Sequence, residues 1–306
     1  MSTQDAQKSI INKQNARSYL GRAFLLKKFV LDICLPSNRI DFLYNIFRDF
    51  ERMRPMLERI KGVLVLLPLL VAFFCGNIVF SLIAIVIGCI SFIELRNALN
   101  KKEIHLSIAA AGLATALMIL RVLGFVGFLS FSVIAIAISF LLATLLVFQQ
   151  YSFSDVSANV LSLLYAFVPF CFISDLYSQN MYLAMLVFVI SFATDIFAYF
   201  SGKFFGKHKL LPKVSPNKTI EGSIGGIIGA TLLSTLFLFI VKLPVLPTIP
   251  ICMIGSVAAQ LGDLFASSIK RYCGIKDFGK LIPGHGGVLD RFDSVMFVAL
   301  LMCVFV

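Results

Sequence analysis

The sequence is poor in charge and in the residue patterns that build metal or disulfide frameworks. Only 14% of its 306 residues are charged, it has three His, and its seven Cys form no CxxC or CxxxC pair. Cys scattered through apolar runs are typical of reduced packing residues, not of a zinc site or a disulfide framework. Residues 1–60 lack the apolar core of a signal peptide, so we expect the membrane helices to direct insertion.

What the chain has in abundance is hydrophobic surface. Hydrophobic residues make up 59% of the sequence, there are 31 Phe, and the mean hydropathy is +0.93. A soluble core cannot bury that much apolar surface, so the composition predicts an integral membrane protein. Because a bilayer core of about 30 Å needs about 20 helical residues, we expect an all-α polytopic fold.

The apolar runs predict about nine transmembrane helices. The run 62–94 would span about 50 Å as one helix, which is too long, so we divide it into a hairpin that breaks near Gly76-Asn77. The other candidate spans are 104–121, 124–148, 157–175, 180–201, 219–241, 245–269 and 288–306.

Charge asymmetry orients these spans. With nine helices, the basic segments 1–61, 203–218 and 270–280 fall on one side with Lys101 and Lys102. The positive-inside rule then places the N-terminus in the cytoplasm, whereas eight spans would leave basic residues 1–61 outside. The net charge of +11 suits anionic phospholipid, and basic residues beside membrane helices argue against nucleic acid.

Three regions follow from these patterns. Residues 1–61 form a basic cytoplasmic extension, which we interpret either as amphipathic helices on the lipid surface or as a solvated segment. Residues 62–175 form an N-terminal transmembrane region, and residues 176–306 form a transmembrane catalytic region. The assignment of catalysis to the last region depends on its acidic residues.

Carboxylates are few beyond Asp175, and nearly all lie in or beside apolar runs. Because a carboxylate at the centre of a membrane helix costs about 2.5–3.5 kcal/mol, such residues usually face a polar cavity, a metal or a basic partner. Simpler interpretations exist for two of them: Asp195 could simply form an ion pair with Lys203 or Lys207, and Glu221 fits a helix start capped by Thr219. The full set is Asp195, Glu221, Asp263, Asp277, Asp290 and Asp293.

The segment "PGHGGVLDRFD" combines acids with glycine. Asp290 and Asp293 are three residues apart and share a helical face. Gly286 and Gly287 would let backbone N–H groups approach an anion at the helix start. Carboxylates with phosphate oxygens favour Mg²⁺, and clustered Lys and Arg bind polyphosphate. This pattern predicts phosphoryl or nucleotidyl transfer onto a lipid.

The longer segment "SSIKRYCGIKDFGKLIPGHGGVLDRFD" at 267–293 resembles the signature of the phosphatidate cytidylyltransferases, or CDP-diacylglycerol synthases. The upstream pieces "TDIFAYFSGKFFGKHKL", "SPNKTIEGSIGG" and "QLGDLFASSIKR" resemble the same family. The resemblance is strong over residues 195–294 and does not cover the first 60 residues. It implies the reaction of CTP with phosphatidate to give CDP-diacylglycerol and pyrophosphate, with Mg²⁺ and, as an open alternative, a second metal ion.

The resemblance also implies roles for individual residues. Asp263 and Asp290 would hold metal, with Asp293 or Asp277 as further ligands. Basic side chains would bind the phosphates of CTP or of the phosphatidate headgroup. His285 would be either a hydrogen-bond donor to phosphate or a packed turn residue. The basic residues are Lys270, Arg271, Lys276 and Arg291, and the remaining substrate-binding candidates are Asp195, Ser215, Lys218, Glu221, Gly286 and Gly287.

Two other functions fit parts of the pattern. A CTP-dependent lipid kinase uses similar parts, and an ion-coupled transporter also places acids beside Gly-rich broken helices. Clustering of the charges at one membrane face, with no visible inverted repeat, disfavours transport. We expect an inner (plasma) membrane protein whose active site faces the cytoplasm, and the resemblance implies a homodimer.

Overall fold

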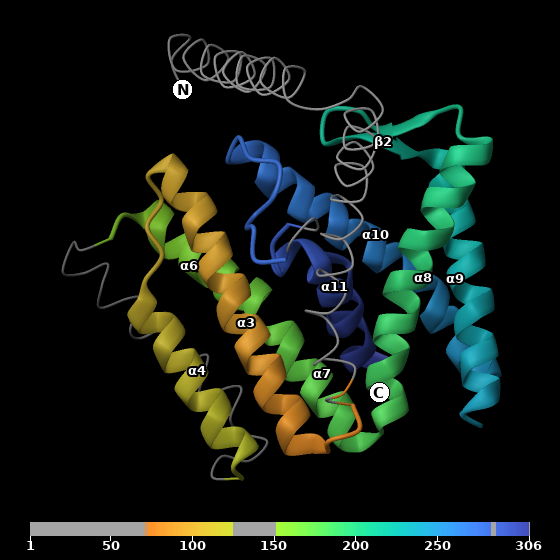
Figure 1. Cartoon of the computed structure of the whole chain (residues 1–306), viewed down its shortest axis with the longest axis horizontal. Helices are drawn as coiled ribbons and strands as arrows, with labels where there is room; N and C mark the ends of the chain where they lie inside the picture. The colour runs from red at the N-terminus through yellow and green to blue at the C-terminus, as the bar shows by residue number, and fades with distance from the viewer. Residues whose placement is uncertain (1–70, 72, 125–150, 283–285, 306) are drawn as a thin grey trace, which may run out of the picture. The chain divides into compact units, whose positions relative to one another are not determined.

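The computed structural model of the chain describes residues 71, 73–124, 151–282 and 286–305. The chain divides into two units, Met1–Ile60 and Lys61–Val306, and every described residue belongs to the second. The predicted N-terminal extension, the predicted span 124–148 and most of the first half of the 62–94 hairpin lie outside the described residues. The described part is built mainly of α-helices (Figure 1).

Helices dominate every described stretch of the chain. Five helical segments of the described residues are long and apolar enough to cross a membrane, which confirms the predicted class of α-helical membrane protein; the count of nine helices stays a prediction. The elements are α3 (Asn77–Leu99), η1 (Asn100–Lys102), α4 (Ile108–Val122), α6 (Phe153–Ala166), α7 (Val168–Gln179), α8 (Met181–Phe205), β1 (Lys209–Leu211), β2 (Ser215–Thr219), α9 (Ile220–Ile240), η2 (Leu246–Thr248), α10 (Ile249–Tyr272) and α11 (Leu289–Phe305).

Local chemistry sets two of the helix boundaries. Helix α3 begins at Asn77, at the predicted break, because Gly76 adopts a φ of +97°, a conformation that glycine tolerates and a helix does not. The predicted span 157–175 lies within the candidate membrane span Phe153–Gln179, but it is not one continuous helix, because α6 and α7 meet at Phe167. Pro169 explains the break, since its ring nitrogen cannot donate to a carbonyl of the preceding turn.

A small β-hairpin departs from the predicted all-helical fold. Strands β1 and β2 pair antiparallel, with Lys209 opposite Thr219 and Leu211 opposite Ser215. The hairpin joins α8 to α9, and Thr219 at its end caps α9 by accepting a hydrogen bond from the N–H of Gly222 at 3.1 Å. The hairpin therefore projects from the helix ends without interrupting them.

Helices α8 and α9 lie side by side along their length (Figure 1). Glycines on α9 allow the close approach: a Cβ at Gly222 would lie 2.8 Å from the carbonyl oxygen of Ala198, and one at Gly226 would lie 3.0 Å from the Cβ of Ala198. Small residues at such interfaces let membrane helices pack backbone to backbone. This pair forms one wall beside the acidic residues of α10 and α11.

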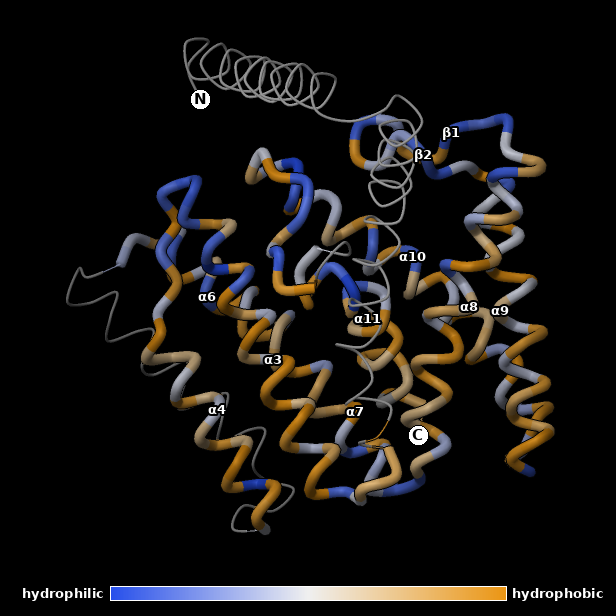
Figure 2. The backbone as a smooth tube through the Cα atoms, in the orientation of Figure 1, coloured by the Kyte–Doolittle hydropathy of each residue, from blue (hydrophilic) through white to orange (hydrophobic). Residues whose placement is uncertain are grey.

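Polar contacts join α10 to the α8–α9 pair. The hydroxyl of Thr194 donates to that of Ser256 at 2.8 Å, and Ser223 donates to the Gln260 side-chain oxygen at 2.5 Å. Hydrophilic residues gather at one end of the described bundle, on the α3–α4 connection, the β-hairpin and the end of α10 (Figure 2). The polar helix ends that the sequence predicted to share a membrane face thus lie together.

Candidate active site

Asp263 on α10 forms the first part of the site. Its carboxylate makes an ion pair with Lys218, which strand β2 delivers from the hairpin. The hydroxyl of Ser267, one turn further along α10, lies 3.4 Å from the same carboxylate. The hairpin therefore has a clear role at the site, because it carries a lysine to a membrane-edge carboxylate.

Asp195 and Asp293 lie next to each other across two helices. The hydroxyl of Ser294 on α11 lies 3.3 Å from Oδ2 of Asp195 and 3.5 Å from Oδ1 of Asp293, so it bridges them. The charge of Asp263 on α10 acts on both carboxylates. Three carboxylates from α8, α10 and α11 thus face a common region, and Asp293 is only 7% exposed.

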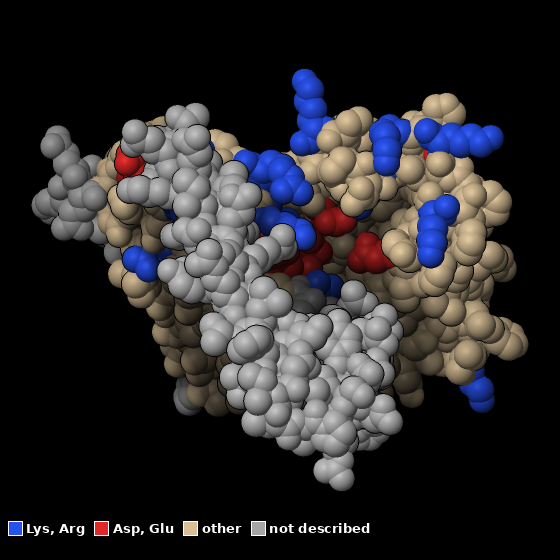
Figure 3. Space-filling view, turned by 45° about the horizontal axis from the view of Figure 1, so that its top comes forward, with Lys and Arg blue, Asp and Glu red and all other residues tan. Residues whose placement is uncertain are grey.

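Basic side chains balance part of this negative charge. Lys218 and Arg291 attract Asp195, and Lys270 attracts Asp293. In the part of the chain that the structure describes, Asp195 makes no ion pair with Lys203 or Lys207, the simpler partners considered from the sequence. Figure 3 shows Asp and Glu side chains in a hollow of the described surface, with Lys and Arg beside them.

Asp290 holds together the loop that precedes α11. Its Oδ1 lies 2.9 Å from Nζ of Lys270, and its Oδ2 accepts hydrogen bonds from the N–H groups of Phe278 at 2.8 Å and Gly287 at 3.0 Å. The side chains of Lys270 and Asp290 are 11% and 5% exposed, so this is a buried ion pair. Asp290 therefore serves as an anchor of the loop in addition to its predicted metal role.

The glycine-rich turn is closed by a backbone bridge. Ile282 and Gly286 exchange two backbone hydrogen bonds of 2.9 and 3.1 Å, and Gly286 has a φ of +94° that favours glycine. His285 lies outside the described residues. The N–H of Gly287, which the sequence predicted to face an anion, donates here to Asp290.

Glu94 is a buried acid of the site that sequence reasoning missed. It lies on α3, is 7% exposed, and its carboxylate accepts hydrogen bonds from the N–H groups of Val288 at 3.0 Å and Leu289 at 2.8 Å. A Cβ at Gly279 or Gly287 would clash with this carboxylate. An acid at a helix start satisfies N–H groups that have no partner within the helix. Glu94 thus caps α11 from another helix, and its position at the end of an apolar run was the available signal.

Glu221 behaves as the helix-start carboxylate considered from the sequence. Its carboxylate lies 2.7 Å from Nδ1 of His208 and accepts hydrogen bonds from the N–H groups of Lys207 and His208 at 3.1 and 3.2 Å. It thereby ties the segment after α8 to the start of α9. Ser215 lies on β2, the same strand as Lys218.

The remaining basic candidates lie around the end of α10 and the start of α11. Arg271 donates from Nε to the carbonyl of Val214 at 3.3 Å, which links α10 to the hairpin. Lys276 and Asp277 are exposed in the segment after α10, and Arg291 is exposed on the first turn of α11. The structure thus brings together, between α8, α10, α11 and the hairpin, the residues Asp195, Lys218, Asp263, Lys270, Asp290, Arg291 and Asp293.

The oxygen-rich donor set of this region is of the kind that suits Mg²⁺. Asp195, Asp263 and Asp293 offer only carboxylate oxygens, and their mutual repulsion would be relieved by a cation. Among the described residues, no three His, Cys, Asp or Glu side chains converge closely enough to form a complete ligand cage. That arrangement is compatible with Mg²⁺, which usually takes one or two protein carboxylates and completes its shell with water and phosphate.

Fold and site together define an integral membrane protein with a charged site, built from carboxylates and lysines, where its helices end. Residues 58–306 match the model of the family described as the cytidylyltransferase family. The chain belongs to the cytidylyltransferase family, which confirms the resemblance found in the sequence.

Curated relatives agree with that assignment. A phosphatidate cytidylyltransferase of Staphylococcus aureus (strain COL) is 36% identical over 247 residues, covering 79% of this chain and 94% of the relative. Proteins of the same name from Staphylococcus haemolyticus and Staphylococcus saprophyticus are 36% and 34% identical over 251 residues, with the same coverage. The similarity therefore extends over nearly the whole length of these relatives.

Proposed function

We propose that this chain is a phosphatidate cytidylyltransferase, which converts CTP and phosphatidate to CDP-diacylglycerol and pyrophosphate. The observation that carries the proposal is the family match over residues 58–306, together with relatives of that name that align over 94% of their length. The charged site at the helix ends supports the same chemistry, because both substrates are polyanions.

In this reaction a phosphate oxygen of phosphatidate attacks the α-phosphorus of CTP. The bond from that phosphorus to the bridging oxygen of the β-phosphate breaks, and pyrophosphate leaves with the bonding electrons. Because the second pKa of a phosphomonoester is about 6, the attacking oxygen already carries charge at neutral pH and needs little help from a general base. The site must instead overcome repulsion between two anions.

Lysines that are paired with carboxylates in the structure would supply the positive charge that overcomes this repulsion. Lys218 pairs with Asp263 and Lys270 pairs with Asp290, so both lysines are held at the site before any substrate binds. We expect their ammonium groups to bind phosphate oxygens of the substrates, with Arg271, Lys276 and Arg291 at the rim. Ordering these side chains in advance lowers the entropic cost of positioning the reactants.

Mg²⁺ is the cofactor that the donor set supports. The family resemblance assigns Asp263 and Asp290 as ligands, and Asp293 and Asp195 are further carboxylates on which the charge of Asp263 acts. When bound, the ion would supply positive charge that offsets the repulsion between the two anionic substrates. Around it, Ser294 orients two of the carboxylates and Glu94 holds the helix start that carries Asp290 and Asp293.

The site is expected to face the cytoplasm. The basic loops around the site face the cytoplasm, in a nine-helix arrangement in the inner (plasma) membrane, because Lys and Arg are retained on that side. CTP then reaches the site from the cytoplasm and phosphatidate from the bilayer. A homodimer is the assembly that we expect by family resemblance.

The test is the fate of the phosphorus atoms of CTP. With purified protein and phosphatidate, label at the α-position should enter the lipid and label at the γ-position should leave as pyrophosphate. Entry of γ-label into the lipid would instead establish a CTP-dependent lipid kinase. No CTP turnover would favour a transport function.

A further inference from the structure

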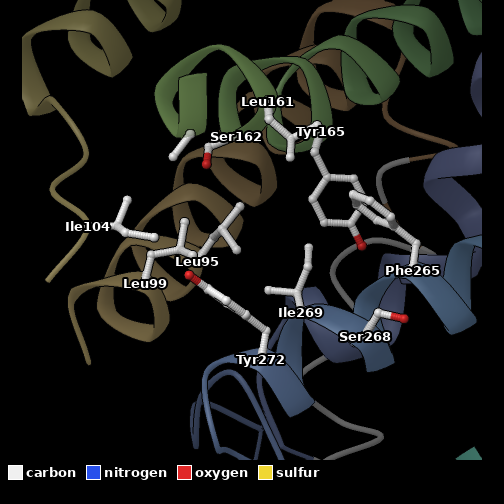
Figure 4. A pocket seen from close by; sticks show the side chains of 11 residues that line it. Leu95, Leu99, Ile104, Leu161, Ser162, Tyr165, Phe265, Ser268, Ile269 and Tyr272 are labelled. Carbon is white, nitrogen blue, oxygen red and sulfur yellow. The ribbon is translucent and has the colours of Figure 1, made fainter. Parts of the chain in front are cut away.

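An apolar cavity of about 350 Å³ lies between α3, α6 and α10 (Figure 4). Helix α10 contributes Phe265, Ile269 and Tyr272 to its wall, α6 contributes Leu161 and Tyr165, and α3 contributes the pair Leu95 and Leu99. Its volume lies within the range of about 300–1,000 Å³ that is usual for small-molecule sites. Its lining is almost entirely hydrocarbon, which suits an apolar chain.

The cavity and the carboxylate site use opposite faces of α10. Asp263, Ser267 and Lys270 follow one another at spacings of four and three residues and share a face. Phe265, Ile269 and Tyr272 have the same spacings but are displaced by two residues, which is about 200° around the helix. A phosphatidate molecule in reaction position near Asp263 therefore has α10 between its phosphate and this cavity.

One end of the cavity carries positive charge. The ammonium group of Lys102 lies 5.6 Å from the ring centroid of Tyr272, and Lys101 and Lys102 are the cations that act on neighbouring Cys273. The other end is formed by Tyr165 and Phe265, whose rings meet edge to face at 5.0 Å (Figure 4). Phe265 precedes Tyr272 by seven residues, so the cavity runs about 10 Å along α10 from a basic rim to an apolar floor.

The cavity opens to the protein surface within the membrane-spanning part of the helices. Leu161 on α6 and Tyr272 on α10 line it and are 52% and 58% exposed. A basic rim above an opening of this kind matches an amphipathic ligand with an anionic head and an apolar tail. Phospholipid of the surrounding bilayer has that chemistry.

We propose that this cavity binds one acyl chain of an anionic phospholipid of the bilayer, with the lipid phosphate at Lys101 and Lys102, as a site separate from the reaction centre. The lipid fills the apolar face of α10 and so supports the helix that presents Asp263 and Lys270. The ring of Tyr165 lines the cavity, and its hydroxyl is buried. That hydroxyl has no hydrogen-bond partner among the described residues.

Photo-crosslinking of the full chain in phosphatidylcholine nanodiscs tests the site. The probe is phosphatidylglycerol with a diazirine on one acyl chain, and the comparison is phosphatidylcholine with the same chain. We expect several-fold more crosslinking by the anionic probe, located on residues 158–165 of α6 and 265–272 of α10. Equal labelling by both probes, or labelling concentrated on other helices, would overturn the proposal.

Matched variants separate the cavity from the general lipid surface. Ala158→Phe fills the cavity from α6 and should lower crosslinking at least about fivefold, whereas Val160→Phe adds the same ring to an exposed position of α6 that does not line the cavity and should leave it unchanged. Lys101→Ala with Lys102→Ala should remove the preference for the anionic probe without altering the apolar wall. If Ala158→Phe crosslinks like the wild type, or if the double lysine variant retains the preference, the proposal is wrong.

A competition arm identifies the source of the lipid. Unlabelled phosphatidylglycerol and unlabelled phosphatidate should both reduce crosslinking, with phosphatidate at most about a few-fold stronger because its phosphomonoester carries a second charge. Far stronger competition by phosphatidate would assign the cavity to the substrate and overturn a separate site. The crosslinking does not depend on turnover, so its result stands whether or not α-labelled CTP enters lipid.

Discussion

Oε2 of Glu94 lies 2.8 Å from the backbone nitrogen of Leu289, so that α3 caps the first turn of α11. The other carboxylate oxygen accepts from Val288 at 3.0 Å. The two residues are far apart in sequence, yet their contact fixes the start of the helix that carries Asp290 and Asp293. The geometry of the acidic site thus depends on a residue outside the conspicuous motif.

Glu94→Ala should destabilise the protein and lower its activity. It leaves two buried N–H groups without an acceptor, and each such group costs about 1–3 kcal/mol. Glu94→Gln retains one acceptor oxygen and should have a smaller effect. Thermal unfolding in detergent, measured beside CTP turnover, checks this, with Glu103→Gln in the exposed α3–α4 connection as control. A Glu94→Ala protein with wild-type stability and activity would show that the cap is dispensable.

Gly287→Ala should impair the site by displacing the Glu94 carboxylate. A Cβ at this position would lie 2.5 Å from Oε2 of Glu94, which is far inside a normal contact. We expect at least about a tenfold loss of turnover. Gly112→Ala is the matched control, because no atom lies within 4 Å of its added Cβ and alanine favours a helix by about 0.5–1 kcal/mol. Equal activity of the two variants would contradict the close packing of Gly287 on Glu94.

Asp290→Asn should reduce turnover at least about 100-fold, since removing one strong electrostatic contact of a reaction site typically costs about 2.7–4 kcal/mol. It should also lower stability, because Asp290 is paired with Lys270 and accepts two backbone hydrogen bonds. Lys270→Ala and the double variant complete a double-mutant cycle, and steady-state kinetics measures the loss of turnover in each variant. A double variant whose loss equals the product of the single losses would show that the two residues act independently.

The membrane orientation predicts which loops a reagent can reach. Cysteine introduced at Lys209 or Lys280 should react with an impermeant maleimide only from the cytoplasmic side. Lys242, at the opposite ends of α9 and α10, provides the control and should react only from outside. Labelling of Lys209→Cys from outside intact cells would refute the orientation and the cytoplasmic access of CTP.

The sequence identified candidate site residues but not the contacts that hold them. Asp263 and Asp290 were singled out because carboxylates in apolar runs are costly, and that cost is visible in a single chain; their metal role stays a prediction. Glu94 was missed because its hydrogen-bond partners, Val288 and Leu289, are distant from it in the sequence. An acid at the end of an apolar run also resembles an ordinary helix boundary. The pairing of Lys218 with Asp263 depends on the β-hairpin, whose short strands have too little periodicity to be recognised.

Helix boundaries show the same limit. The break at Gly76 was predicted because the bilayer restricts helix length, a constraint that acts on the sequence itself. The break between α6 and α7 was overlooked although Pro169 is visible, because the apolar run continues across it and proline is tolerated in membrane helices. Length and polarity could therefore be predicted, whereas contacts between distant segments could not.

The measurement that most directly tests the proposed activity follows the α- and γ-phosphorus of CTP in parallel, with wild-type protein and Asp263→Asn. Wild-type protein should place one α-phosphorus in lipid for each pyrophosphate released, lose this activity with EDTA and regain it with Mg²⁺. Asp263→Asn should remain folded but transfer at least about 100-fold less α-label. Entry of γ-label into lipid, or full α-transfer by Asp263→Asn at limiting Mg²⁺, would contradict the assignment of this site to cytidylyl transfer.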